Sequence, residues 1–212
     1  MTLLHVRHLG RTRYEDAYAL QKELLLARIA DEIPDTLLVT EHERVVTLGR
    51  GSPRGAQGTT ALPVFEVERG GEATWHGPGQ LVAYPIRFLP ESERDLHVYL
   101  RQLEEVVIGV LAQFGVDGSR VMGKTGVWVG PLKLCSIGVA VRRWVTWHGL
   151  ALNVTNDLAD FRAFEPCGLD PALMTRLADH TGQPVTMADA ERALVAEFAR
   201  VFRCEVRESK AI

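Results

Sequence analysis

The sequence predicts an α+β fold in which a mixed β-sheet is flanked by helices. Segments with strand character occur in runs, and helical segments are inserted between the runs instead of alternating with single strands. Hydrophobic residues make up 46% and charged residues 24% of the 212 residues, which is typical of globular proteins and excludes disordered and low-complexity chains. This length predicts one domain over residues 1–212.

The first half of the chain begins with an expected strand over residues 3–8. A helix is expected over residues 13–30, because its apolar side chains recur at helical spacing, and Pro34 closes this region. Strands are then expected over residues 36–41, 44–48, 64–68 and 80–88, with a Gly-, Ser- and Pro-rich loop over 49–61.

The second half begins with the clearest helix of the sequence, over residues 96–114. Its apolar stripe indicates a core-facing side, and Gly115 stands where a C-terminal cap belongs. Residues 126–154, rich in Val, Ile, Trp and Thr, predict a meander of strands. We expect helical structure over residues 171–180 and a last helix over 187–202, opened by a capping box from Thr186 to Asp189.

Charge and apolar patterning exclude several classes of partner. Lys and Arg number 24 against 27 Asp and Glu, a net charge of −3, so the chain lacks the basic excess of proteins that bind a nucleic-acid backbone. Apolar runs such as residues 106–111 are far shorter than the roughly 20 residues that span a bilayer, and residues 1–8 do not resemble a signal peptide. Three cysteines without a CxxC pair fit reduced thiols, so we expect a cytoplasmic protein.

Residues 69–80 are the densest candidate site. They contain four glycines together with Arg69, His76 and Pro78 between two expected strands. Glycines let backbone amides approach a ligand closely, and proline stiffens the loop. The alternative is a wide hairpin with one solvated histidine.

Residues 133–141 form a second candidate, an expected strand whose period-two alternation places Lys133, Cys135, Ile137 and Val139 on one face. Lys133 is either a surface lysine with a buried stem or a partly buried cation that acts on a ligand. Gly138, on the other face, would admit a close neighbour. His148 is more typical of a structural, hydrogen-bonded histidine than of a catalyst.

Cys167 forms a third candidate, in a loop directly before the helix expected to start at Asp170 and Pro171. A helix N-terminus and a nearby lysine would lower the thiol pKa and favour the nucleophilic thiolate. The alternative is a small packed residue, and composition alone does not favour Cys167 over Cys135. Cys204, in the last helical region, is expected to be structural.

Two further patterns are set aside. Residues 118–125 match the P-loop pattern, but strand character follows them where phosphate binding needs a helix N-terminus. A metal site built from His76, His148, Cys135 and Cys167 lacks the short ligand spacing of zinc sites.

Several motifs in order nevertheless resemble one family along nearly the whole chain, the lipoyl(octanoyl) transferases. The motifs are Arg69-Gly70-Gly71 with Thr74, His76-Gly77-Pro78-Gly79-Gln80 and Tyr84-Pro85; Lys133 with Ser136-Ile137-Gly138; His148-Gly149 with Ala151-Leu152-Asn153-Val154; and Pro166-Cys167-Gly168-Leu169. The last motif separates this family from its relatives that use ATP.

The resemblance implies the fold of the biotin/lipoate protein ligase catalytic domain. It also implies transfer of an octanoyl group from octanoyl-acyl carrier protein to Cys167, and then to a lysine on lipoyl domains of 2-oxoacid dehydrogenase complexes or on the glycine-cleavage H protein. Lys133 would lower the Cys167 pKa or act as a base. Neither ATP, a metal nor a cofactor is implied, and a monomer without nucleic-acid or membrane partners is expected.

The same resemblance implies which residues line the acyl site. They are Arg69, Gly70, Gly71, Glu72, Ala73, Thr74, Trp75 and His76, then Ser136, Ile137 and Gly138, then Gly149, Leu150 and Ala151. A basic patch using Arg50, Arg54, Arg142 or Arg143 is expected to receive acidic carrier domains. The rival interpretations are an ATP-dependent lipoate-protein ligase, in which Lys133 would contact an acyl phosphate, and a binding module without turnover.

Overall fold

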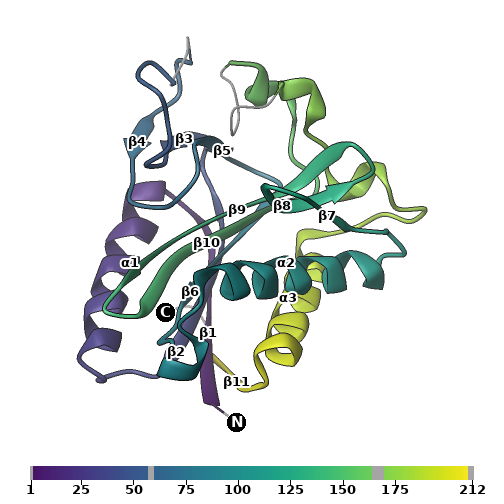
Figure 1. The fold of residues 1–212 in the computed structure, drawn as a ribbon. Helices are drawn as coiled ribbons and strands as arrows, with labels where there is room; N and C mark the ends of the chain where they lie inside the picture. Colours follow the sequence, from purple (N-terminus) through teal and green to yellow (C-terminus); the bar gives the residue numbers. More distant parts are fainter. Residues whose placement is uncertain (1, 57–59, 164–169, 210–212) are drawn as a thin grey trace.

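The computed structural model describes residues 2–56, 60–163 and 170–209, which form a large and a small β-sheet with three α-helices (Figure 1). The helices are α1 (Tyr14–Ile29), α2 (Leu96–Gln113) and α3 (Met187–Phe202). The large sheet has the spatial order β11 (Cys204–Ser209), β1 (Thr2–Thr12), β2 (Asp35–His42), β6 (Gln80–Ile86), β10 (Val145–Asn153), β9 (Leu132–Arg142), β8 (Lys124–Val129) and β7 (Ser119–Val121). The small sheet has the order β4 (Val64–Glu66), β3 (Val45–Leu48) and β5 (Ala73–His76).

The large sheet is mixed, as the sequence predicts. β1 pairs in parallel with both β11 and β2, whereas the pairs from β2 to β7 are antiparallel. In the small sheet, β3 is parallel to β4 and antiparallel to β5. The predicted meander over residues 126–154 is confirmed as the antiparallel run of β8, β9 and β10.

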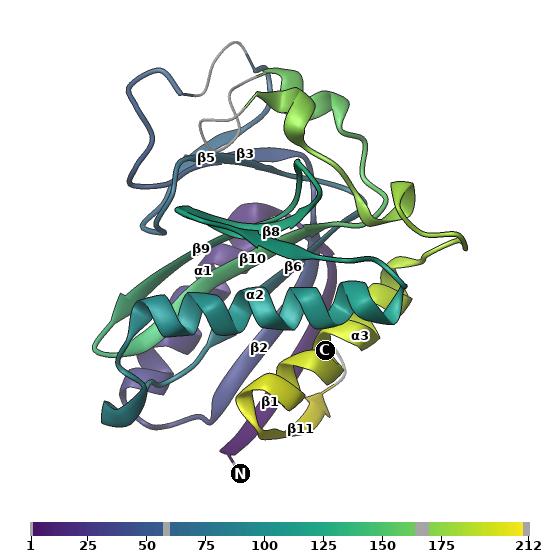
Figure 2. The ribbon, with the colours of Figure 1, turned by 45° about the vertical axis from the view of Figure 1, so that its right-hand side comes forward.

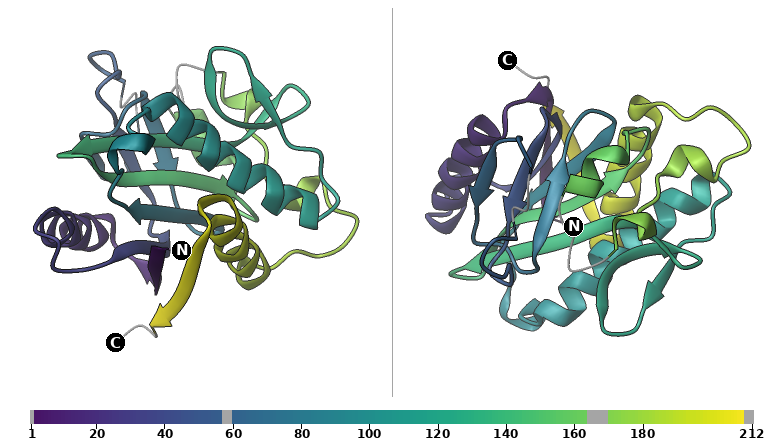
Figure 3. Two further views of the ribbon diagram at one scale, coloured as in Figure 1. Left: turned by 60° about the horizontal axis from the view of Figure 1, so that its bottom comes forward. Right: turned by 90° about the horizontal axis from the view of Figure 1, so that it is seen from above.

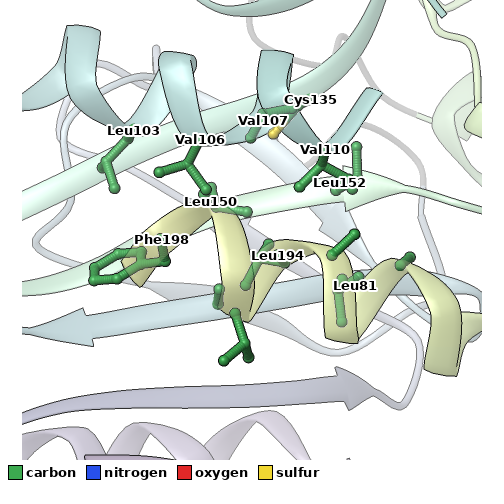
Figure 4. Close-up of a cluster of buried hydrophobic side chains, with 14 of the residues drawn as sticks. Leu81, Leu103, Val106, Val107, Val110, Cys135, Leu150, Leu152, Leu194 and Phe198 are labelled. Atoms are coloured by element: carbon green, nitrogen blue, oxygen red, sulfur yellow. The ribbon is translucent and has the colours of Figure 1, made fainter. Parts of the chain in front are cut away.

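The helices cover the two faces of the large sheet unequally. α2 and α3 lie side by side on one face, and α1 lies on the other, where the small sheet stands above the β8–β10 region (Figures 2 and 3). Strand alternation explains the two cores, since Leu37 and Val39 pack with α2 and α3 while Leu38 packs with α1. Figure 4 shows Val106 of α2 and Leu194 of α3 meeting Leu150 of β10 in the larger core.

The predicted boundaries of α2 and α3 are confirmed by the cap geometry. The Asp95 carboxylate accepts hydrogen bonds from the backbone N–H groups of His97 and Val98 at the start of α2, and Gly115 adopts φ +71° beyond its end. Thr186 and Asp189 form the expected capping box of α3.

Three expectations about elements were wrong. The candidate loop over residues 69–80 contains β5. Residues 171–180 form two short 3₁₀ turns, Pro171–Leu173 and Leu177–Asp179, because Met174 pairs with Lys133 and the Thr175 N–H bonds to the Lys133 carbonyl, which keeps the chain between them extended. Cys204 opens β11 and packs in the core, outside the last helix.

The P-loop-like segment folds as expected from its context. Residues 119–121 and 124–129 form the antiparallel hairpin β7–β8, and no helix follows its turn in the described chain. Across residues 2–56, 60–163 and 170–209, no helix has the length and apolarity needed to cross a membrane.

Candidate active site

A cavity of about 390 Å³ lies between the large sheet and the small sheet. It brings together most of the residues that the sequence motifs predict. These are Arg69, Gly71, Glu72, Thr74, His76, Lys133, Ser136, Ile137, Gly138, Gly149, Leu150 and Ala151. We call this space the acyl cavity, after the expectation from the sequence motifs, whose test is given under the proposed function.

Three expected lining residues do not face the acyl cavity. Strand β5 alternates, so Thr74 and His76 point into the cavity while Ala73 and Trp75 pack in the core of the small sheet. The expectation for Ala73 and Trp75 was therefore wrong, because the segment was treated as a loop and not as a strand. Gly70 does not line the cavity either, since it crosses over β9.

Arg69 fixes the Gly-rich loop to the small sheet. Its Nη2 donates to the Thr47 carbonyl at 2.9 Å and to Thr47 Oγ1 at 2.8 Å, and its Nη1 donates to the Glu72 carbonyl at 2.8 Å. The side chain is buried. These donors hold the loop 69–72 in shape, so Arg69 builds the cavity wall as well as facing the cavity.

Gly138 is the point at which this loop crosses the large sheet. The Gly70 N–H donates to the Val139 carbonyl at 2.9 Å, and a Cβ on Gly138 would lie only 2.8 Å from the Gly70 carbonyl oxygen. The expectation that Gly138 admits a close neighbour is confirmed, and that neighbour is the loop itself.

Lys133 and Cys135 lie on different faces of β9, contrary to the period-two expectation. Val127 of β8 pairs with Cys135, whereas Trp128 pairs with Lys133, so Leu134 is an extra residue in a β-bulge. The bulge reverses the alternation between the two side chains. Lys133 faces the acyl cavity, and Cys135 packs against α2 (Figure 4).

Burial also removes Cys135 as a candidate nucleophile. The side chain is fully buried, and burial raises the pKa of its thiol to about 12, against a smaller opposing effect of Lys133. A thiol with that pKa is protonated at neutral pH and is a poor nucleophile.

Lys133 is 5% exposed and lies beside Trp128, with its Nζ 5.7 Å from the centre of the indole ring. Lys124 Nζ lies 5.5 Å from the same ring. No described acidic side chain forms an ion pair with Lys133. The aromatic ring therefore contributes a favourable cation–π contact to both lysines.

Sequence reasoning missed the hairpin residues at this end of the cavity. Gly123, Lys124, Thr125 and Trp128 all line it, from the segment set aside as a P-loop mimic. The alternation of an expected strand over residues 126–129 could have indicated that Trp128 faces one side, but not that the β7–β8 hairpin borders the cavity.

A chain of hydrogen bonds ties the three cavity motifs together. His76 Nδ1 donates to Gln80 Oε1 at 2.8 Å, and Gln80 Nε2 donates to Asn153 Oδ1 at 2.9 Å. Asn153 Nδ2 donates to the Thr175 carbonyl at 2.9 Å, and the Thr175 N–H donates to the Lys133 carbonyl at 2.9 Å. Burial holds the His76 pKa well below its usual value, so the ring is neutral. This series of hydrogen bonds fixes the backbone of Lys133 relative to the Gly-rich loop.

The opposite end of the acyl cavity is formed by side chains from α1, β6 and β10. Tyr14, Tyr84 and His148 line it, and Val82 and Ala151 pair across β6 and β10 to form an apolar floor. The sequence motifs contained Tyr84 and His148 without assigning them to the site, and Tyr14 was concealed within the periodicity of a helix.

His148 is 1% exposed, and its Nε2 has no hydrogen-bond partner among the described residues. The nearest carboxylate oxygen is Glu68 Oε2, 4.0 Å away. Burial, aided by the charges of Arg69, Lys22 and Arg50, lowers the His148 pKa to about 3, so the ring is neutral at physiological pH. Its ring stacks with Trp147 and Tyr18, which agrees with the expected structural role, but in the described structure Nε2 lacks the hydrogen bond that was expected of this residue.

The predicted nucleophile Cys167 lies outside the described residues. The described chain resumes at Asp170, whose side chain accepts from the Ala172 N–H and caps the turn Pro171–Leu173, as predicted. That element is a single 3₁₀ turn, so the expected helix N-terminus beside Cys167 is absent from the described chain. Within residues 2–56, 60–163 and 170–209, no group of three His, Cys, Asp or Glu side chains is arranged to hold a metal.

Solved structures share this architecture. The bipartite lipoate protein ligase of Thermoplasma acidophilum superposes with a TM-score of 0.72 over 99% of this chain and 88% of its own, at 18% sequence identity. The fold is that of the lipoate-protein ligase catalytic domains. A family model described as the lipoyl protein ligase A/B catalytic domain matches residues 13–199.

Relatives found by sequence define the class of protein more narrowly than the solved structures do. An octanoyltransferase of Geobacter metallireducens is 48% identical over 193 residues, covering 91% of each chain. An octanoyltransferase of Geobacter sulfurreducens is 47% identical over 191 residues, covering 90% of this chain and 81% of its own. The chain belongs to the lipoyl protein ligase A/B catalytic-domain family and, within it, to the octanoyltransferases.

Proposed function

We propose that this octanoyltransferase takes an octanoyl group from acyl carrier protein onto Cys167 and passes it to a lysine of a lipoyl domain. The observation that carries the proposal is the acyl cavity, whose apolar floor of Val82 and Ala151 leads to the Lys133 end. Each methylene that moves from water onto such a floor contributes about 0.8 kcal/mol. Acceptors of the expected class are the lipoyl domains of 2-oxoacid dehydrogenase complexes and the glycine-cleavage H protein.

The reaction has two balanced steps. In the first, the Cys167 thiolate attacks the thioester carbonyl, a new C–S bond forms, and the carrier's phosphopantetheine thiolate leaves and takes up a proton. In the second, the lysine amine attacks the acyl-enzyme, the C–N bond forms, and the Cys167 thiolate leaves while the amine loses a proton. The incoming thioester is already activated, so the proposal requires neither ATP nor a metal.

Lys133 has two available roles in this scheme. As an ammonium near the thiol it stabilises the thiolate, and as a neutral amine it accepts the proton of the attacking lysine. Its burial, its contact with Trp128 and the hydrogen bond to its carbonyl support a fixed position for either role.

Intact-protein mass spectrometry after mixing with octanoyl-acyl carrier protein, without ATP, tests the proposal. We expect an octanoyl adduct that hydroxylamine removes and that an apo-lipoyl domain discharges. The adduct should persist in Cys135→Ser and disappear in Cys167→Ser. Lys133→Met should form it slowly.

Two other results would contradict the proposal. An adduct that needs ATP and free octanoate would indicate a lipoate-protein ligase. Absence of any adduct or transfer under both conditions would indicate a binding module.

A further inference from the structure

A second cavity, of about 450 Å³, lies on the other side of the Gly-rich loop from the acyl cavity. We define the basic groove by six of its lining residues, Lys22, Leu26, Arg50, Glu68, Arg142 and Trp147. The crossing of Gly70 over Val139 separates the two spaces. Residues of β9 up to Gly138 line the acyl cavity, and residues from Ala140 onward line the groove.

The charges of the basic groove are unbalanced. Lys22, Arg50 and Arg142 are exposed, and none of them forms an ion pair with an acidic side chain in the described parts of the chain. Glu68 is the acidic member of the groove, and its Oε2 accepts a hydrogen bond from the Tyr18 hydroxyl at 2.6 Å. This positive character contrasts with the net charge of −3 for the whole chain.

The groove also carries exposed apolar surface. Leu26 projects from α1 with 54% of its surface exposed, beside Trp147 of β10. An exposed leucine beside cations that have no ion pair among the described residues is complementary to an acidic protein surface that also carries an apolar residue.

We propose that the basic groove docks the acidic carrier protein that delivers the acyl thioester. The proposal rests on the proposed function above and assigns the surface that its donor uses. The groove and the acyl cavity share a wall, because the Arg50 N–H bonds to the Arg69 carbonyl and the Gly51 N–H bonds to the Gly71 carbonyl. A donor held in the groove is therefore one loop away from the acyl cavity.

The separation of the groove from the acyl cavity by the loop 69–72 suits the acyl donor and not the acyl acceptor. A partner docked in the groove must reach across the loop 69–72, which requires a long flexible arm such as phosphopantetheine. The acceptor presents a lysine on its own backbone and has to sit directly over the thioester. Of the four arginines expected to form a basic patch, Arg50 and Arg142 line the groove, whereas Arg54 and Arg143 do not.

Charge reversal tests the groove, with Lys22→Glu, Arg50→Glu and Arg142→Glu made singly and together. Each enzyme is assayed with octanoyl-acyl carrier protein and with octanoyl-pantetheine, which carries the same thioester without the protein. We expect each reversal to raise the KM for the carrier-bound substrate about fivefold, and the triple variant to raise it further, with little change in kcat. The KM values for octanoyl-pantetheine and for the lipoyl domain should not change.

Arg207→Glu is the matched control, because Arg207 is an exposed cation on the edge strand β11, which β1, β2 and β6 separate from β10 of the groove. It makes the same change in net charge and should leave the carrier KM unchanged. If a reversal prevents folding, the alanine variant at that position should shift the carrier KM in the same direction by a smaller factor.

Three results would overturn the docking proposal. They are an unchanged carrier KM in the triple variant, an equal rise with octanoyl-pantetheine, or a rise confined to the lipoyl domain. Failure of the parent enzyme to transfer from either thioester would contradict the proposed function instead, so the two failures are distinguishable.

Discussion

Gly126 of β8 lies directly against the side chain of Lys133. A Cβ on Gly126 would be 2.9 Å from Lys133 Cε and 2.5 Å from the Cys135 carbonyl oxygen, and the residue adopts φ +135°. The Gly126 N–H donates to Glu104 Oε1 at 3.1 Å, and the Glu104 carboxylate is buried in α2. The position of the Lys133 stem therefore depends on a glycine that α2 holds in place.

The first prediction concerns Gly126→Ala. The new methyl group meets both the Cys135 carbonyl oxygen and the Lys133 stem and displaces Lys133. Because a misplacement of about 1 Å can cost about 10²-fold in rate, we expect acyl-enzyme formation to slow by roughly that factor. Rapid-quench mass spectrometry measures it. Gly130→Ala is the control, since Gly130 also has positive φ (+56°) but no atom lies within 4 Å of its Cβ position. Equal loss of rate in both variants would contradict a steric role for Gly126.

The second prediction concerns Asn153→Ala. This change removes the partner of one Gln80 amide N–H and of the Thr175 carbonyl, both buried, and we expect a loss of about 3 kcal/mol in the free energy of unfolding, measured with urea. Asn156→Ala is the control, because Asn156 is equally buried but its side-chain amide has no hydrogen-bond partner in the described structure. A larger loss of stability in Asn156→Ala than in Asn153→Ala would contradict the role of this series of hydrogen bonds.

The third prediction concerns pH. Burial lowers the pKa of His42 to about 4 and that of His148 to about 3, whereas both titrate near about 6.5 in the unfolded chain. The unfolded chain therefore binds protons first. The contribution of these histidines to the free energy of unfolding is fully present above about pH 6.5. It falls as the pH drops towards 4, by up to about 1.4 kcal/mol per pH unit for each histidine.

Urea titrations at about pH 7 and about pH 5.5 measure this slope. His42→Gln should reduce the dependence of the free energy of unfolding on pH, because the side chain no longer takes up a proton on unfolding. His97→Gln should leave it unchanged, since His97 is exposed at the start of α2. A parent protein with equal stability at both pH values would be inconsistent with buried neutral histidines.

The fourth prediction concerns acyl-chain length. Ala151 pairs with Val82 on the cavity floor, so Ala151→Leu fills part of the acyl cavity. We expect the ratio of kcat/KM for eight-carbon over four-carbon thioesters to fall by about tenfold or more, because the added atoms exclude the distal methylenes. The KM for the lipoyl domain should stay constant, and a uniform loss with all chain lengths would indicate general disruption.

Local patterns in the sequence predicted most of the fold. The apolar stripe and caps of residues 96–114 and 187–202 were sufficient for α2 and α3, since helical hydrogen bonds and caps are local. Most of the described motif residues line one cavity, and Arg69, His76 and Lys133 are buried polar side chains there.

The errors came from features that depend on a partner strand. The bulge at Leu134 separated Lys133 from Cys135, and nothing within β9 alone marks it, because a bulge is defined by the pairing with β8. Trp128 reaches the acyl cavity because the β7–β8 hairpin meets strands distant in sequence, and the basic groove forms where α1 meets such strands. Cys167 remains a prediction from its motif.

The parallel pairing of β1 with β11 sets an order for assembly of the large sheet. Thr2 lies opposite Cys204 and Leu4 opposite Val206, so the outer edge of β1 has no other strand to complete it. During synthesis this edge stays open until Cys204–Ser209 have left the ribosome, although β1 is made first. Such distant pairing is slow to form, and an unpaired strand edge is a template for other chains. Newly made molecules are therefore most exposed to aggregation in the interval before β11 docks.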